Sequence, residues 1–251
     1  MHDKNNSNSR GKTTGAALDK RLSQGTPGRA RRDENVTPRQ IDALKAECLA
    51  KTPPKVTLVR QRAVEGLAAS GLAERAMHAG EQAPAFQLRD SYGGAFSSRE
   101  ALRRGPIVLV FYRGRWCPYC NIDLGAIEAA SHDIRSLGAS LVVVSQQTPD
   151  NSLETQRRNR LSFASLVDVG GKVAHAFGLR WKVSDELRAV EEGCGMDLAA
   201  FNGDPSWTLT MPARYVVAPG GMIEYADISV DYTRRGDPSE LIPVLAHLAA
   251  H

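Results

Sequence analysis

The sequence predicts an α/β fold in which a central sheet, mixed but mostly parallel, is flanked by helices and preceded by an N-terminal helical extension. Two observations predict it. Continuous apolar runs at 107–112 and 139–145 have the composition of strands that are buried on both faces. Segments with helical signals follow each run, and this alternation is typical of βαβ units around a parallel sheet.

Composition limits the class of protein. The 251 residues suffice for one domain of ordinary size with extensions. Residues 1–35 carry eight basic and four acidic side chains, and the remainder carries 24 of each. The basic excess therefore belongs to a tail, which argues against a nucleic-acid-binding domain. Because no apolar run reaches transmembrane length and no secretory signal is present, we expect a cytoplasmic protein that does not bind a membrane.

Three regions follow from the composition along the chain. Residues 1–35 are polar and nearly free of large apolar side chains, so we expect a disordered basic tail. Residues 36–78 form the helical extension: Thr37 is the predicted N-cap of its first helix, and a second apolar stripe follows Pro54. Cys48 lies on the apolar face of the first helix and is interpreted as a packed core thiol.

The main domain is predicted at 79–251. It starts with an edge strand and hairpin at 85–97, followed by a short helix before the central strand. Residues 179–210 have no clean periodicity and are interpreted as an insertion. The other predicted elements are a helix capped by Thr148, a strand at 161–167, a short helix at 173–177, an antiparallel hairpin at 213–230 and a terminal helix after Asp237.

The central strand leads through a short loop into Cys117-Pro118-Tyr119-Cys120, at the start of a helix. With Cys117 as N-cap, Pro118 takes the first helical position, which suits its fixed φ. The Cys117 sulfur could then accept hydrogen bonds from free backbone N–H groups at the positive end of the helix dipole. We therefore predict a Cys117 pKa of roughly 3.5 to 7.5 and a nucleophilic thiolate. Cys120, one turn further along, suits a resolving thiol.

Other uses of a Cys-x-x-Cys motif fit poorly. A zinc site needs two more ligands at matching spacing, and Cys48 and Cys194 are isolated in the sequence. Haem attachment needs His after the second Cys, where this chain has Asn121. We expect neither a metal nor another cofactor. Two inert core thiols remain the alternative to a redox pair.

Several segments carry a family resemblance. Trp116-Cys117 at a helix start, Met211-Pro212 before a hairpin and the closing helix resemble the thioredoxin fold, and Cys-Pro-Tyr-Cys is the glutaredoxin form of its motif. Within that fold, further segments resemble the peroxiredoxin family of the alkyl hydroperoxide reductase and thiol-specific antioxidant type. They are 80–88, 108–112, 167–168, 173–178 and 231–235, and the resemblance covers about 79–251.

The resemblance implies a thiol-dependent peroxidase that reduces hydrogen peroxide and organic hydroperoxides in antioxidant defence and cell redox homeostasis. Cys117 would attack the O–O bond and become a sulfenic acid, which Cys120 or, alternatively, Cys194 would convert to a disulfide. Trp116 would shield the thiolate, and Pro212 would be the cis-proline whose backbone faces it. The implied partners are the peroxide substrate, a thioredoxin- or glutathione-type reductant and a second copy in a homodimer.

The chain departs from the family pattern at Val110 and Gly114, where typical members carry Pro and a hydroxyl residue. Arg113, Arg115 and Arg214 are the candidates to polarise the peroxide instead, and the alternative for each is a solvated surface charge. Two other functions stay open at this point. One is a thiol–disulfide oxidoreductase acting on protein disulfides, and the other is a non-enzymatic redox-sensing or interaction module that uses residues 179–210 as its contact surface.

Overall fold

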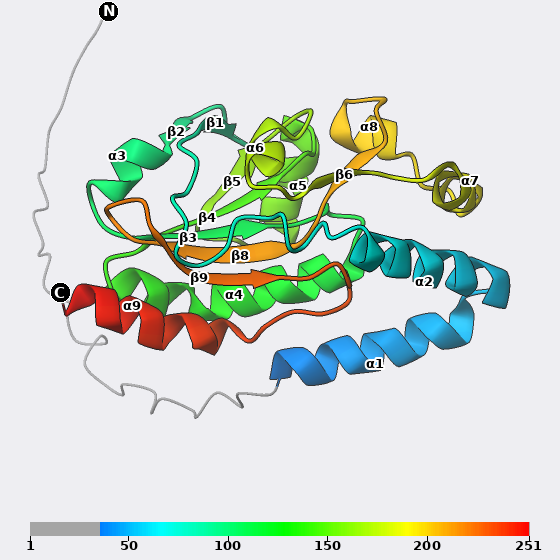
Figure 1. Cartoon of the computed structure of the whole chain (residues 1–251), viewed down its shortest axis with the longest axis horizontal. Coiled ribbons are helices and arrows are strands. Elements are labelled where there is room, and N and C mark those ends of the chain that lie inside the picture. The colour runs from blue at the N-terminus through cyan, green and yellow to red at the C-terminus, as the bar shows by residue number, and fades with distance from the viewer. Residues whose placement is uncertain (1–35, 251) are drawn as a thin grey trace, which may run out of the picture. The chain divides into compact units, whose positions relative to one another are not determined.

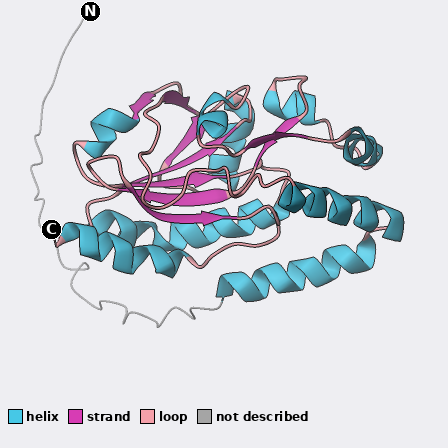
Figure 2. Ribbon diagram, in the orientation of Figure 1, coloured by secondary structure: helices cyan, strands magenta, loops and turns pink. Residues whose placement is uncertain are grey.

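A seven-stranded sheet forms the centre of the molecule, with helices against it (Figures 1 and 2). The structure is a computed structural model that describes residues 36–250, so the predicted tail at 1–35 lies outside the described residues. The strand order is β2-β1-β5-β4-β3-β8-β9. This arrangement is the predicted α/β fold.

Parallel pairing is confined to the middle of the sheet. There β4 (Ser140–Ser145) pairs in parallel with β3 (Ile107–Phe111) and with β5 (Ala164–Val167). The other four pairs are antiparallel and involve β1 (Gln87–Asp90), β2 (Ala95–Ser97), β8 (Ala213–Val217) and β9 (Ile223–Ile228). Short turns link β1 to β2 and β8 to β9, whereas β1 pairs with β5 and β8 pairs with β3 through long connections. A mixed sheet was predicted correctly, but "mostly parallel" was wrong.

Two helical layers cover the sheet. On one face, the apolar sides of α4 (Pro118–Ser136) and α9 (Leu241–Ala249) pack against alternate residues of β3 and β4. The opposite face packs against α3 (Ser98–Leu102) and α6 (Lys172–Ala176), while α5 (Pro149–Arg158) contacts β5. The Thr148 hydroxyl caps α5 as predicted, and Asp237 forms a capping box at the 3₁₀ turn η1 (Pro238–Glu240) before α9.

The predicted helical extension consists of α1 (Val36–Lys51) and α2 (Pro54–Ala69). Helix α1 packs on α4, and α2 packs on α7 (Asp185–Gly193), as Figure 1 lets the reader follow. Because α1 begins at Val36, Thr37 lies inside its first turn and does not precede the helix as predicted. Through α1 the extension thus packs directly on the helix that begins after Cys117.

Residues 179–210 are ordered. They contain α7, α8 (Leu198–Asn202) and a two-stranded antiparallel sheet of β6 (Arg180–Lys182) and β7 (Thr208–Thr210). These elements are short, which explains why the sequence shows no clear period. Their apolar side chains form a small core with Val59 of α2, and Trp116 packs at its edge: Val183, Leu187, Leu198, Trp207 and Leu209.

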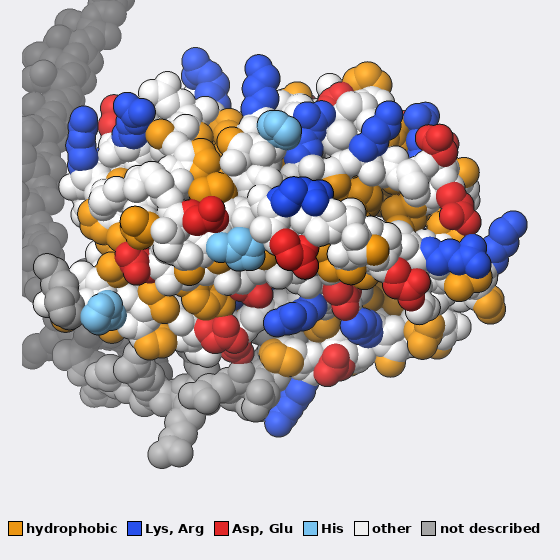
Figure 3. Space-filling view, viewed as in Figure 1, with side chains coloured by type: hydrophobic (Ala, Val, Ile, Leu, Met, Phe, Trp, Pro, Cys, Tyr) orange, Lys and Arg blue, Asp and Glu red, His pale blue; other side chains and the backbone are white. Residues whose placement is uncertain are grey.

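None of the helices in residues 36–250 is both long enough and apolar enough to cross a membrane. Figure 3 shows acidic and basic side chains interspersed over one face of the molecule. This distribution agrees with the equal numbers of each charge outside residues 1–35.

Candidate active site

Cys117 stands where the sequence places it, at the N-cap of α4, with extended backbone angles and Pro118 in the first helical position. Cys120 follows one turn later on the same helix. Both cysteines are free thiols and both are buried, Cys117 with 1% and Cys120 with 0% of the residue exposed. The two sulfurs thus lie next to one another beneath the protein surface, at the end of β3.

The prediction about the ionisation of Cys117 is wrong. Its side chain makes no capping hydrogen bond with the start of α4. Burial raises the pKa of Cys117 well above its ordinary value, and a hydrogen bond with Cys120 raises it further. The dipole argument failed because the sulfur is turned towards its partner and is shielded from water, and desolvation disfavours a thiolate.

Cys120 is the member of the pair that ionises first. Burial acts to raise its pKa, but the hydrogen bond from Cys117 and the charges of Arg235 and Arg113 outweigh burial and lower the pKa of Cys120 to about 6. Arg235 Nη2 lies 3.3 Å from Cys120 Sγ. Because the two thiols interact, the first ionisation is a property of the pair. The resulting negative charge lies mainly on the Cys120 sulfur.

The charges behind Cys120 favour this thiolate. Asp123, one turn further along α4, accepts a 2.6 Å hydrogen bond from Arg214 Nη2, and its other oxygen lies 3.3 Å from Arg235 Nε. All three side chains are almost fully buried. Two guanidinium groups and one carboxylate leave one positive charge, which an ionised Cys120 neutralises. Since an uncompensated buried charge is costly, the cluster stabilises the thiolate form.

Arg113 is the cation nearest to Cys117. Its Nη1 lies 4.0 Å from Cys117 Sγ. The guanidinium is held between two aromatic rings, with its carbon 4.5 Å from the ring centre of Trp116 and 4.2 Å from that of Tyr232. These cation–π contacts fix the charge beside the sulfur, and no carboxylate of residues 36–250 forms an ion pair with it, so Arg113 can polarise an oxygen atom placed there.

The other predicted residues lie as follows. Arg115 donates to Asn151 Oδ1 at 2.9 Å and lies over the ring of Phe201, so its charge is directed to those groups. Arg214 contacts Asp123 in the buried cluster and acts on Cys120 only through it. Pro212 lines a pocket together with Arg113. The expectation that Arg115 or Arg214 polarises a peroxide receives no support from these contacts.

Two more thiols were identified in the sequence. Cys194 is exposed at the C-terminal end of α7 and lines neither of the two cavities described below. Cys48 is half-buried on α1, hydrogen-bonds with the Tyr119 hydroxyl and lines the same cavity as Cys117. The interpretation of Cys48 as a core thiol is therefore corrected, because the facing helix leaves it beside an open space.

Sequence reasoning missed Asp123, Tyr232 and Arg235. Asp123 carried a signal, since it is a charged residue three positions after Cys120 on the otherwise apolar face of α4. Tyr232 and Arg235 belong to a segment that resembles the peroxiredoxin family, but nothing in their spacing indicates contact with a helix more than a hundred residues earlier.

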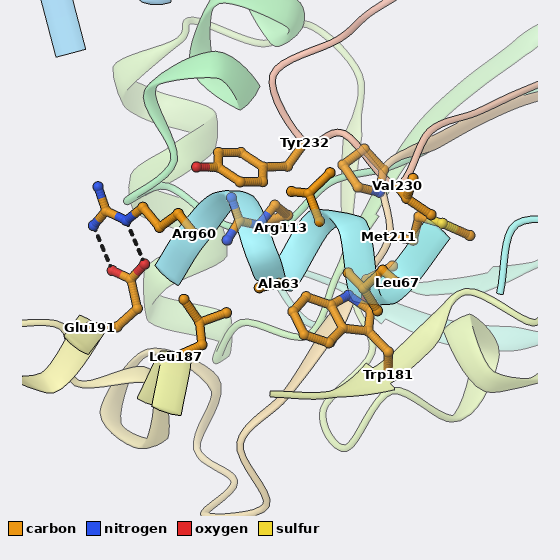
Figure 4. A pocket seen from close by; sticks show the side chains of 13 residues that line it. Arg60, Ala63, Leu67, Arg113, Trp181, Leu187, Glu191, Met211, Val230 and Tyr232 are labelled. Atoms are coloured by element: carbon orange, nitrogen blue, oxygen red, sulfur yellow. Dashed lines mark hydrogen bonds and ion pairs between the residues drawn. The ribbon is translucent and has the colours of Figure 1, made fainter. Parts of the chain in front are cut away.

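Two cavities that share lining residues lie beside the site and α2. The first, the entry groove, has a volume of about 530 Å³ and is bordered by Cys48, Val64, Arg113, Cys117 and Tyr232. The second, the inner pocket, has a volume of only about 20 Å³, lies beneath α2 and shares Val64, Arg113 and Tyr232 with the groove. Figure 4 shows Arg113 and Tyr232 beside α2, with the Arg60–Glu191 ion pair at one end of the pocket.

The geometry at Gly114 leaves no room for the hydroxyl side chain that typical family members carry at this position. Its φ is +155°, and a Cβ at this position would lie 2.5 Å from Trp116 Nε1. A threonine would therefore displace the indole that holds Arg113. In this chain, the aromatic and cationic contacts occupy the space that a hydroxyl side chain would need.

A Gly114→Ala variant should consequently be less stable by about 1–3 kcal/mol, because it combines strained backbone with overpacking. Urea denaturation measures this loss. Gly125→Ala is the matched control, since a Cβ there meets nothing within 4 Å inside α4, and alanine should stabilise that helix by roughly 0.5–1 kcal/mol. Equal effects of the two substitutions would contradict the role given to Gly114.

No metal site is evident in residues 36–250: no three His, Cys, Asp or Glu side chains come together in a way that could hold an ion.

The chain has clear similarity to known proteins. Residues 79–226, more than half of the chain, match the AhpC/TSA family. A thiol-disulfide oxidoreductase, ResA of Halalkalibacterium halodurans, is 32% identical over 41% of this chain and 57% of that protein. Peroxiredoxin Q of Oryza sativa subsp. japonica is 30% identical over 40% of this chain and 46% of that protein. The chain thus spans about half the length of these curated relatives.

Solved structures show the same fold. Peroxidoxin BcpB of Mycobacterium tuberculosis matches with a TM-score of 0.52 and 19% identity, covering 69% of this chain and 97% of that one. Reduced 2-Cys peroxiredoxin of Plasmodium vivax matches with a TM-score of 0.54 and 11% identity, covering 70% and 83%. These likenesses confirm the predicted peroxiredoxin-type thioredoxin fold. The α1–α2 extension lies outside the family match.

Proposed function

The chain belongs to the AhpC/TSA family, and from this premise we propose that it is a thiol-dependent peroxidase that uses Cys117 and Cys120. One observation carries the proposal: the two thiols are hydrogen-bonded to each other, with Arg235 3.3 Å from Cys120 Sγ and Arg113 4.0 Å from Cys117 Sγ. A dithiol that shares one proton beside two cations is suited to a two-electron oxidation.

Cys117 is the attacking thiol in this proposal because it borders the entry groove, whereas Cys120 does not. The Cys117 proton passes along the hydrogen bond to the Cys120 thiolate, which acts as its base. The Cys117 thiolate then attacks the terminal peroxide oxygen and the O–O bond breaks. The alkoxide leaves and takes the proton from Cys120, which is then a thiolate again. Arg113 stabilises the negative charge that develops on the leaving oxygen.

Cys120 is the resolving thiol. As a thiolate it attacks the Cys117 sulfenic acid, an S–S bond forms, and hydroxide leaves and is protonated to water. Two thiols and one hydroperoxide thus give one disulfide, one alcohol and one water. The external reductant, a dithiol of the thioredoxin type or glutathione, returns two electrons and two protons. Cys194 has no part in this cycle.

Two measurements test the function. Stopped-flow mixing should show that the reduced protein consumes hydroperoxide far faster than free cysteine does. Peptide mass spectrometry after one equivalent of peroxide should then show a disulfide between Cys117 and Cys120. A rate equal to that of free cysteine would refute the peroxidase, and a disulfide that contains Cys194 would refute the assignment of the resolving thiol.

A second candidate function has specific support. The likeness to a thiol-disulfide oxidoreductase, together with the Cys-x-x-Cys spacing, favours exchange with protein disulfides. Insulin reduction by the dithiol form, compared with peroxide consumption by the same preparation, separates the two activities. Burial of both sulfurs argues for the smaller substrate, because a protein disulfide would have to approach a residue that is 1% exposed.

A further inference from the structure

The entry groove is built largely by residues that the family match does not include. Its walls comprise one face of α1, from Lys45 to Leu49, the following Thr52, and one face of α2, from Thr57 to Val64. Both faces meet the Cys117 loop and Tyr232 across the groove. The extension therefore forms part of the space through which a substrate reaches the reactive sulfur.

The groove is polar at one end and apolar along its length. The polar end holds Cys117 Sγ and the Arg113 guanidinium, which lie 4.0 Å apart. Beyond it most of the lining surface is apolar, although about half of the lining side chains are polar or charged. The inner pocket, about 20 Å³ in volume, shares Val64 with the groove and lies beneath α2, where Figure 4 shows Ala63, Leu67, Trp181, Met211 and Val230. Such a shape complements a molecule with an oxygen-bearing group at one end and an apolar group at the other.

Apart from Arg113, the charged side chains that line the groove form ion pairs with one another. Arg60 makes two hydrogen bonds of 2.8 Å with Glu191, and Lys45 lies 3.5 Å from Asp231. Among the basic side chains that line the groove in residues 36–250, Arg113 is the one without a carboxylate at ion-pair distance. The walls thus favour a neutral apolar group, while the remaining cation faces the reacting oxygens.

We propose that α1 and α2 bind the organic group of the oxidant, so that the protein selects hydroperoxides with a bulky aryl or branched alkyl group over hydrogen peroxide. This inference rests on the proposed peroxidase function and assigns its substrate class to the helical extension. Hydrogen peroxide fills only the polar end, whereas the larger molecule also removes apolar wall surface from water.

Leu49 and Leu58 offer a matched test. Both are exposed leucines of the extension, 63% and 46% exposed, but Leu49 lines the groove and Leu58 lines neither cavity. For the full chain with saturating dithiothreitol, kcat/KM is measured with cumene hydroperoxide and with hydrogen peroxide. The wild type should prefer cumene hydroperoxide, and Leu49→Ser should lower the ratio of the two kcat/KM values roughly 5- to 20-fold. Leu58→Ser should leave the ratio unchanged.

Val64→Ser extends the test to the boundary between the groove and the inner pocket, and it should lower the same ratio. Circular dichroism verifies that each variant is folded. If hydrogen peroxide is reduced but the ratio is the same in all four proteins, the proposed site is wrong while the peroxidase function stands. If neither oxidant is reduced, the proposed function itself fails. If Leu49→Ser changes only the KM for a protein reductant such as thioredoxin, the groove binds the reductant and the inference is overturned.

Discussion

A Cys117→Ser variant should lose peroxide reduction, with the rate falling roughly 10³-fold or more towards the background of a non-catalytic protein. The sulfur that attacks the O–O bond is then absent, and the serine hydroxyl is not a nucleophile at neutral pH without a base that matches it. Stopped-flow peroxide consumption measures the loss. Arg113, the buried charge cluster and the fold should persist, since the substitution exchanges one small buried atom.

Cys120→Ser and Cys194→Ser complete this series. Without Cys120, one equivalent of peroxide should be consumed slowly and a sulfenic acid should accumulate at Cys117, because both the base and the resolving thiol are missing. A sulfenic-acid-specific label followed by mass spectrometry detects it. Cys194→Ser should turn over like the wild type, because Cys194 lies outside both cavities. Full activity of Cys117→Ser would end the redox interpretation of this site.

An Arg235→Met variant should show the second large effect. It removes the guanidinium 3.3 Å from Cys120 Sγ but leaves Asp123 paired with Arg214. A hydrogen bond to a buried charged group contributes about 1.5–3 kcal/mol, and 1.36 kcal/mol corresponds to one pKa unit. The first thiol ionisation, which has a pKa of about 6 in the wild type, should therefore rise by roughly one to two units.

The pH dependence gives the sign of this effect. In the wild type, the shared thiolate is formed above about pH 6, so peroxide consumption should fall as the pH decreases through that value. In Arg235→Met the fall should occur at higher pH, so that activity at neutral pH drops and alkaline buffer restores it. Thiolate absorbance in the ultraviolet, titrated in parallel, reports the same midpoint without turnover.

Arg234→Met is the matched control, since this neighbouring arginine is exposed and donates no hydrogen bond to either sulfur. It should leave both the titration and the rate profile unchanged. An Arg235→Met protein with an unshifted thiol titration would show that the buried charge cluster does not stabilise the thiolate.

Much of the fold was predictable because its signals are local. The buried runs of β3 and β4, the Thr148 cap, the Asp237 capping box and the position of Cys117 at the start of α4 follow from composition and spacing within a few residues. Strand direction was less predictable. The edge hairpins made the sheet richer in antiparallel pairs than the alternation of strands and helices indicated.

By itself the sequence determined that a Cys-x-x-Cys motif stands at the start of a helix in an α/β domain. Only the tertiary structure decided which sulfur holds the negative charge, because Arg235 comes from a segment 115 residues after Cys120 and desolvation depends on what covers both atoms. It also decided that α1 and α2 border the reactive site. Periodicity shows that a helix has an apolar face, whereas the partner of that face is set by three-dimensional packing.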